Sequence, residues 1–181
     1  MGNQMEFETV IEFWKNAGEK KWFSKSSEFD SEFRTKFLDA HLAAAARKLD
    51  DWAGDPQGAL ALVVLLDQFP RNCFRDTAHM FATDPLARLF AKRAIDAGFD
   101  ARVEKTIRLF FYMPLMHSED LADQDRSVAL FEKLGPDLVK YAVTHRDIVA
   151  RFGRFPHRNA SLARDATPEE KAFLDAGGFA G

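Results

Sequence analysis

Apolar residues recur along most of the chain at intervals of three and four residues, which places them on one face of an α-helix. No stretch alternates apolar and polar residues convincingly enough to predict a β-strand. The pattern therefore predicts an all-α fold of about eight helices joined by short links. These helices are expected near residues 8–16, 27–51, 56–69, 85–98, 104–112, 118–135, 136–152 and 168–176.

Several residues mark where these helices begin and end. Asp55-Pro56 and Asp84-Pro85 each place an N-cap residue before a proline at the first helical position, which is a start signal. Gly18 is expected to end the first helix, because many helices stop at a glycine. Pro70 and Pro114 are expected to end the third and fifth helices, since proline cannot continue the backbone hydrogen bonds.

The third helix is the most apolar part of the chain. Its residues 59–66 read Ala-Leu-Ala-Leu-Val-Val-Leu-Leu. A helix that is apolar on all sides is surrounded by other elements, so this one is expected to be central. We therefore expect a single all-helical domain over residues 1–181, with its core at about 7–176 and irregular helical hairpins closed around the central helix.

Arg108 is a polar residue in an apolar run. Residues 107–116 contain only one other polar side chain, that of Tyr112, and a spacing of four places the two on one helix face. A buried guanidinium must be paired or must hold an anion. Arg108 therefore belongs either to an ion pair with an acid from another helix or to an anion site.

Asp67 and His145 also interrupt apolar patterns. Asp67 lies in the expected last turn of the third helix, where the helix dipole disfavours an acid, so Arg71 or Arg108 is expected to offset that cost. His145 lies on a face that is expected to point inward, as either a hydrogen-bonded core histidine or a ligand. That face comprises Leu138, Tyr141, His145, Ile148 and Phe152.

Two segments share a pattern of Phe-Pro followed by arginine and asparagine. They are residues 67–72 and 154–159, and the second has His157 inserted before Arg158 and Asn159. Arginine and asparagine together supply forked donors and an amide, although both segments could simply end helices. His117 precedes an expected cap at Ser118 and is predicted to face a cleft.

The overall composition narrows the class of protein. The 181 residues include 25 basic and 28 acidic side chains, for a net charge of −3, with 46% hydrophobic residues. These values are typical of a globular protein and exclude a disordered chain or a uniformly basic coat. The chain has 18 phenylalanines and 2 tyrosines, so its core is rich in rings and could include a homodimer surface.

Cysteine, metal and targeting signals are weak or absent. Cys73 is the only cysteine, so neither an internal disulfide nor a thiolate metal cage is expected, and no cofactor is predicted. The first residues lack a secretory pattern, and the longest apolar run is far below the ~20 residues that a bilayer requires. We therefore expect a cytoplasmic protein with no membrane partner, starting at Met1 or Met5.

One segment is locally basic. Residues 145–164 contain five arginines and only one acid, Asp147, with Phe152 and Phe155 between them. Such a stretch suits a phosphate, a carboxylate or a nucleic-acid backbone. The sequence pI of about 6.0 argues against nucleic acid. A small anionic ligand or an acidic peptide is the expected partner.

Four segments together resemble a bacterial domain-of-unknown-function family, the one catalogued as 924. They are Leu-Leu-Asp-Gln-Phe-Pro-Arg-Asn (65–72), Phe-Ala-Thr-Asp-Pro-Leu-Ala (81–87), Phe-Tyr-Met-Pro-Leu-Met-His-Ser-Glu-Asp (111–120) and His-Arg-Asp-Ile-Val-Ala-Arg-Phe-Gly-Arg-Phe-Pro-His-Arg-Asn (145–159). The resemblance implies an all-helical fold similar to tetratricopeptide-repeat arrays and brings no established activity. The residues themselves show no repeat of about 34 positions, so the hairpins are expected to stack irregularly.

The leading functional hypothesis is a cleft that binds a small anionic ligand, with catalysis left open. Arginines would hold the anion, Tyr112 and the asparagines would orient it, and a histidine could move a proton. The alternatives are a tetratricopeptide-like groove for a peptide and a buried polar network that only fixes helix packing. A ligand site predicts unpaired arginine donors. The expected cleft residues are Asp67, Arg71, Asn72, Arg108, Tyr112, His117, His145, His157, Arg158 and Asn159.

Overall fold

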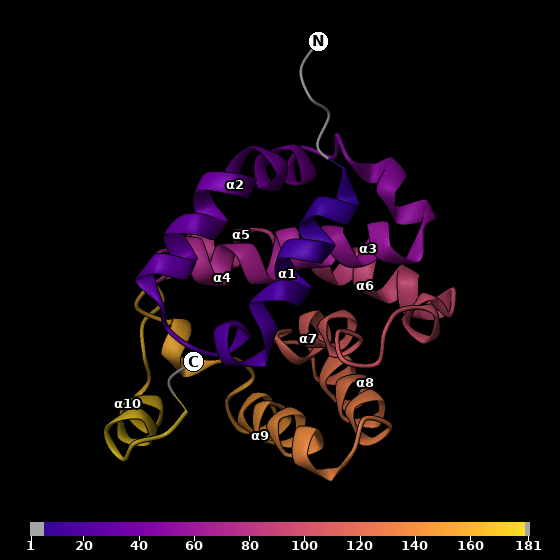
Figure 1. The fold of residues 1–181 in the computed structure, drawn as a ribbon. Coiled ribbons are helices and arrows are strands. Elements are labelled where there is room, and N and C mark those ends of the chain that lie inside the picture. Colours follow the sequence, from indigo (N-terminus) through magenta and orange to yellow (C-terminus); the bar gives the residue numbers. More distant parts are fainter. Residues whose placement is uncertain (1–5, 180–181) are drawn as a thin grey trace. The chain divides into compact units, whose positions relative to one another are not determined.

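A computed structural model describes residues 6–179, and all regular elements within them are helical (Figure 1). The predicted all-α class is therefore confirmed. The chain divides into two compact units. Within the described residues, unit 1 comprises residues 6–75 and 79–114, and unit 2 comprises residues 76–78 and 115–179. The single domain remains a prediction.

Unit 1 contains most of the helices, and α7 carries the chain from it into unit 2. Its elements are α1 (Phe7–Trp22), α2 (Ser27–Ala45), a 3₁₀ helix (Asp50–Gly54), α3 (Pro56–Val63), a π-helical turn (Val64–Gln68), α4 (Phe69–Cys73), α5 (His79–Ala82), α6 (Asp84–Asp96), a 3₁₀ helix (Phe99–Arg102) and α7 (Leu109–Met116). Unit 2 contains α8 (Leu121–Glu132), α9 (Pro136–Phe152), a 3₁₀ turn (Pro156–Arg158) and α10 (Pro168–Asp175).

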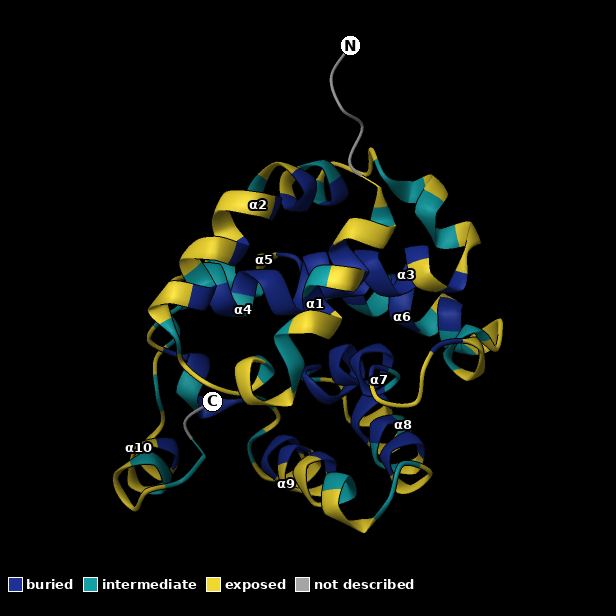
Figure 2. Cartoon of the chain, viewed as in Figure 1, coloured by how far each residue is buried: buried dark blue, intermediate teal, exposed yellow. Residues whose placement is uncertain are grey.

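The predicted central helix is confirmed. Residues 59–66, which span α3 and the start of the π turn, are each at most 1% exposed. α1 and α6 both pack against α3, which is buried along almost its whole length (Figure 2). Asp55 begins this helix as expected, because its side chain accepts hydrogen bonds from the backbone of Gln57 and Gly58.

Aromatic rings fill the space between α1 and α2. Phe13 and Trp14 of α1 contact three phenylalanines of α2, and the distances between ring centroids lie between 5.0 and 6.2 Å. The three are four residues apart in sequence, so they form one stripe on α2. The stripe consists of Phe29, Phe33 and Phe37, all of them buried.

Gly58 allows the 3₁₀ helix 50–54 to approach α3 closely. A Cβ atom at Gly58 would lie 2.3 Å from the backbone oxygen of Trp52. We expect Gly58→Ala to lower the free energy of unfolding by about 1 to 2 kcal/mol, because backbone atoms must shift to admit the methyl group. Urea unfolding followed by circular dichroism measures the change. A free energy of unfolding equal to that of the wild type would show that the 3₁₀ helix 50–54 can shift away from α3 without an energetic cost.

Among the predicted ends of the first three helices, one is confirmed and two are wrong. The first helix is interrupted at Gly18 as predicted, because Gly18 has the non-helical angles φ 70° and ψ 171°, and a second short helical stretch then continues to Trp22. The second ends at Ala45 rather than near residue 51, and the 3₁₀ helix 50–54 follows separately. Helical structure also runs through Pro70, because the chain forms a π-helical turn immediately before it.

The expected helix over residues 104–112 is displaced toward the C-terminus. Residues 105–108 form turns in which the carbonyl of Glu104 accepts from the backbone of Ile107 and Arg108, and α7 begins only at Leu109. Pro114 lies inside α7 instead of ending it. Arg108 therefore precedes the helix and does not share a helical face with Tyr112.

In unit 2, α8 and α9 pack against each other. α8 is capped by Asp120 instead of Ser118, because the Asp120 carboxylate accepts from the backbone of Ala122 and Asp123. α9 has the predicted ends, with Pro136 first and Gly153 after it in a left-handed conformation. His145 is buried on α9 as expected, although Tyr141 of the same predicted face is 54% exposed.

None of the helices formed by residues 6–179 combines the length and the apolar character that crossing a membrane requires.

Candidate functional site

The ten predicted cleft residues fall into two groups. Unit 1 contains Asp67, Arg71, Asn72, Arg108 and Tyr112, and unit 2 contains His117, His145, His157, Arg158 and Asn159. The convergence of all ten residues on one cleft remains a prediction.

The π turn before Pro70 is held by side chains. At this turn the N–H of Phe69 donates to the carbonyl of Val64, five residues back, and Pro70 has no N–H to offer. Four successive carbonyls here accept side-chain hydrogen bonds at 2.6 to 2.9 Å, which helps the helix to pass through a proline. The pairs are His41 to Leu65, Thr83 to Leu66, Arg71 to Asp67 and Asn72 to Gln68.

Asp67 and Arg71 form a buried ion pair. Asp67 is 0% exposed, and its Oδ1 lies 3.1 Å from Nη1 of Arg71. The same guanidinium donates to both carboxylate oxygens of Asp84, at 2.8 and 3.0 Å. Burial alone would lower the pKa of Arg71, but Asp67 and Asp84 outweigh it and raise the pKa. Arg71 is therefore engaged by acids of the chain itself, as the buried-network alternative predicts.

The predicted position of Asp67 at a helix end is wrong, and only one of its two predicted partners is confirmed. Asp67 does not lie in a last turn, because the helix continues through α4, so the expected dipole penalty does not apply. Its partner is Arg71 and not Arg108. The side chain of Asn72 is also hydrogen-bonded within unit 1. Its amide nitrogen donates to the carbonyl of Gln68, and its amide oxygen accepts from Arg75 at 3.0 Å.

The π turn also involves a histidine pair that sequence reasoning missed. His41 is 0% exposed, and its Nε2 lies 3.0 Å from Nε2 of His79. Nδ1 of His41 donates to the Leu65 carbonyl, so Nε2 of the neutral His41 ring accepts a hydrogen bond from Nε2–H of His79. Burial, and next the neighbouring His79, lower the pKa of His41. A signal did exist: His41 follows Phe37 by four residues and continues the buried stripe of α2.

Arg108 differs from Arg71, which is held by two acids. It is half-buried, its Nη2 lies 3.5 Å from the carbonyl of Ala101, and its Nε is buried without a hydrogen-bond partner. No carboxylate within residues 6–179 forms an ion pair with it. Arg108 thus has the unpaired donor that an anion site predicts.

Tyr112 is buried next to the turn that carries Arg108. Its hydroxyl donates to Oδ2 of Asp100 at 2.6 Å. Burial and then this hydrogen bond raise the pKa of Tyr112, while the positive charge of Arg108 opposes the rise. The hydroxyl proton is thus directed at Asp100, so Tyr112 holds this carboxylate and is not a donor for a ligand while Asp100 is ionised.

Three histidines of unit 2 gather around phenylalanine rings. The ring centroids of His117 and His145 are 6.2 Å apart, and His145 and His157 each lie 5.6 Å from Phe155. Arg158 stacks 4.5 Å from the Phe155 ring and donates to the carbonyl of His117 at 2.9 Å. Burial, followed by the charge of Arg158, lowers the pKa of His157 to about 3. The His157 ring is therefore neutral at physiological pH.

The basic segment 145–164 is neutralised within unit 2. Arg154 binds Glu170 at 2.6 Å, and Arg164 binds Glu119 at 2.8 Å. Arg146 and Arg151 pair in the same way with acids outside the segment, Asp125 and Glu169. Asn159 donates to Glu170 as well. Four of the five arginines in this segment therefore pair with acids outside it, which reduces its local positive charge.

Metal or thiolate chemistry has little support in the described part of the chain. No group of three or more His, Cys, Asp or Glu side chains there is arranged to hold a metal ion. Burial raises the pKa of the Cys73 thiol to about 12, which disfavours the nucleophilic thiolate at neutral pH.

The comparisons with known proteins identify a family and bring no activity. Residues 10–178 match the model of a family described as bacterial protein of unknown function (DUF924). A solved structure of a protein of unknown function from Agrobacterium tumefaciens is 54% identical, covers 94% of this chain and 97% of its own, and superposes with a TM-score of 0.92. No curated protein matches. The chain therefore belongs to the bacterial family of unknown function DUF924.

Proposed function

We propose that the protein binds a small anionic ligand, bearing a phosphate or carboxylate group, at Arg108. The observation that carries the proposal is the guanidinium of Arg108, which is half-buried and has no carboxylate partner among the described residues. By contrast, Arg71 binds two acids. A guanidinium with free, partly desolvated donors is suited to a forked contact with a phosphate or carboxylate.

The charges around Arg108 support the same ligand class. The segment 99–108 contains two acids, and both are engaged: Asp100 accepts from Tyr112, and Glu104 pairs with Lys15. Its other two cations, Arg102 and Lys105, are exposed and have no carboxylate partner within the described residues. The segment therefore presents a net positive surface on which an anion would be stabilised.

A titration with inorganic phosphate and with citrate tests the proposal. We expect chemical shifts of residues 99–112 in ¹H–¹⁵N spectra to move with ligand concentration. Arg108→Gln should weaken binding about tenfold or more, because hydrogen bonds to charged groups contribute about 1.5 to 3 kcal/mol. Arg102→Gln is the matched control, since it removes the same charge from the same segment but leaves the donors of Arg108 in place.

Two results would contradict the proposal. Equal losses of affinity in Arg108→Gln and Arg102→Gln would mean that anion binding depends only on the net charge of the segment. If neither phosphate nor citrate moved any chemical shift of residues 99–112, there would be no anion site at Arg108. Asp100→Asn gives an independent check, because loss of this nearby negative charge should strengthen the binding of phosphate.

A further inference from the structure

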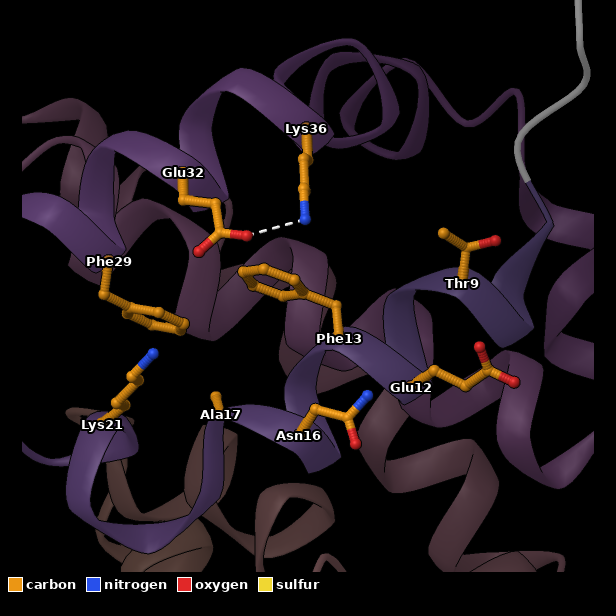
Figure 3. Close-up of a pocket in the computed structure, with 9 residues that line it drawn as sticks. All are labelled: Thr9, Glu12, Phe13, Asn16, Ala17, Lys21, Phe29, Glu32 and Lys36. Carbon is orange, nitrogen blue, oxygen red and sulfur yellow. Dashed lines mark hydrogen bonds and ion pairs between the residues drawn. The ribbon is translucent and has the colours of Figure 1, made fainter.

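Unit 1 carries a second candidate site, a hollow of about 340 Å³ between α1 and α2 (Figure 3). Phe13 and Phe29 form its floor, with their rings almost parallel at 7° and their centroids 5.5 Å apart. Phe29 is buried and Phe13 is partly exposed. The remaining lining residues are Thr9, Glu12, Asn16, Ala17, Lys21, Glu32 and Lys36.

The backbone of α1 shapes one end of this hollow. Gly18 adopts φ 70°, a backbone conformation that residues other than glycine rarely adopt, and this changes the direction of the last turn of α1. This turn brings Nζ of Lys21 to 5.7 Å from the Phe29 ring. Lys21 therefore lies at one end of the lining of α1, whereas Glu12 lies toward the other (Figure 3).

The polar groups of the hollow are available to a ligand. The side chains of Glu12, Asn16 and Lys21 have no hydrogen-bond partner within residues 6–179. Lys36 lies 5.1 Å from the Phe13 ring and pairs with Glu32 at 2.7 Å, but these side chains are 53% and 46% exposed. Exposed pairs of this kind contribute little stability, so a ligand can displace Lys36 from the ring at low cost.

We propose that this hollow binds a short segment of another protein, in which an apolar side chain lies between a basic and an acidic residue. The apolar side chain would cover Phe13 and Phe29. The basic residue would face Glu12 and the acidic residue would face Lys21, so the charges of the segment complement those of α1. A hollow of about 340 Å³ is at the small end of ligand sites and suits one or two side chains.

The spacing along α1 sets the length of the segment. Glu12 and Lys21 are nine positions apart, which corresponds to about 13 Å along a continuous helix. An extended peptide covers about 13 Å in four residues. A suitable probe is therefore the fluorescein-labelled peptide Lys-Gly-Phe-Gly-Glu with blocked ends.

Fluorescence anisotropy with this probe tests the proposal on the full-length protein. We expect saturable binding that weakens at least tenfold for Lys21→Glu and for Glu12→Lys. The double variant with both changes should recover most of the affinity, because the peptide can then lie in the opposite direction. A loss of fold would not be recovered in this way. The matched control combines Glu132→Lys with Lys171→Glu, two exposed positions of unit 2, and should bind like the wild type.

Three outcomes would overturn the proposal. The first is equal binding of a probe in which glycine replaces phenylalanine, which would exclude the ring floor as the anchor. The second is a double variant as weak as the single ones. The third is a change in the spectra of the lining residues with the concentration of the protein alone, which would make a second copy of this chain the occupant.

Discussion

Replacing Asp67 with alanine is expected to lower the free energy of unfolding by about 3 to 5 kcal/mol, the largest effect of any single substitution considered for this protein. Asp67 is fully buried, and its carboxylate contacts both the Arg71 guanidinium and the Gln68 amide, which donates at 2.6 Å. The variant would leave buried donors unsatisfied, which costs more than the original pair contributes. Chemical unfolding at neutral pH, followed by circular dichroism, measures the difference.

Asp84→Ala is the matched comparison for this experiment. Asp84 binds the same guanidinium, but its side chain is 16% exposed, so water can replace part of what is lost. We therefore expect a smaller destabilisation than for Asp67→Ala. A larger destabilisation for Asp84→Ala than for Asp67→Ala would mean that Asp84, and not Asp67, is the main partner of Arg71.

Glu170→Gln is expected to destabilise the protein by about 3 kcal/mol at pH 7. Glu170 is 2% exposed, and its carboxylate accepts from Arg154, Asn159 and the backbone of Thr167 at 2.6 to 3.2 Å. The hydrogen bond from Arg154 lowers the pKa of Glu170 from 4.5 to about 2, against the opposing effect of burial. The charged form is therefore the one that stabilises the fold.

The lowered pKa of Glu170 determines how the free energy of unfolding depends on pH. Because the pKa of Glu170 is lower in the folded than in the unfolded chain, its contribution is fully present above about pH 4.5 and is lost as the pH falls toward 2. The difference in stability between wild type and Glu170→Gln should therefore shrink over that interval. Glu169→Gln is the control, because Glu169 is the adjacent residue but is 63% exposed. A constant difference across the interval would disprove the role of the Glu170 charge.

Helix boundaries were predictable where the signal is local. The start of α9 follows from Pro136, and the start of α6 follows from Asp84-Pro85, since each signal acts on the next turn of the same helix. Pro70 misled the prediction because its effect depends on distant groups. His41 and Thr83 supply the hydrogen bonds that make a helix through this proline possible, and neither is near it in sequence.

The candidate site was predicted less completely, for the same reason. The unusual position of Arg108 in an apolar run was visible in the sequence, and the structure adds that no carboxylate among the described residues pairs with it. The basic segment 145–164 looked equally promising, but Glu119 and Glu170 neutralise two of its arginines from outside the segment. Local charge counts cannot reveal such pairs, because tertiary folding determines which charges meet.

Insertions and deletions between Pro56 and Val63 are expected to be rare among relatives of this chain. The π turn over residues 64–68 holds one more residue than an α-helical turn would. Removing a residue from α3, which precedes this turn, would rotate the π turn by about 100° around the helix axis, so the carbonyl of Leu65 would turn away from His41. Removing one residue from the π turn itself would instead leave an ordinary α-helical turn and disturb the flanking residues less. The length of α3 is thus constrained more strongly than the identity of its apolar residues, so divergence here should proceed by exchange of side chains rather than by gaps.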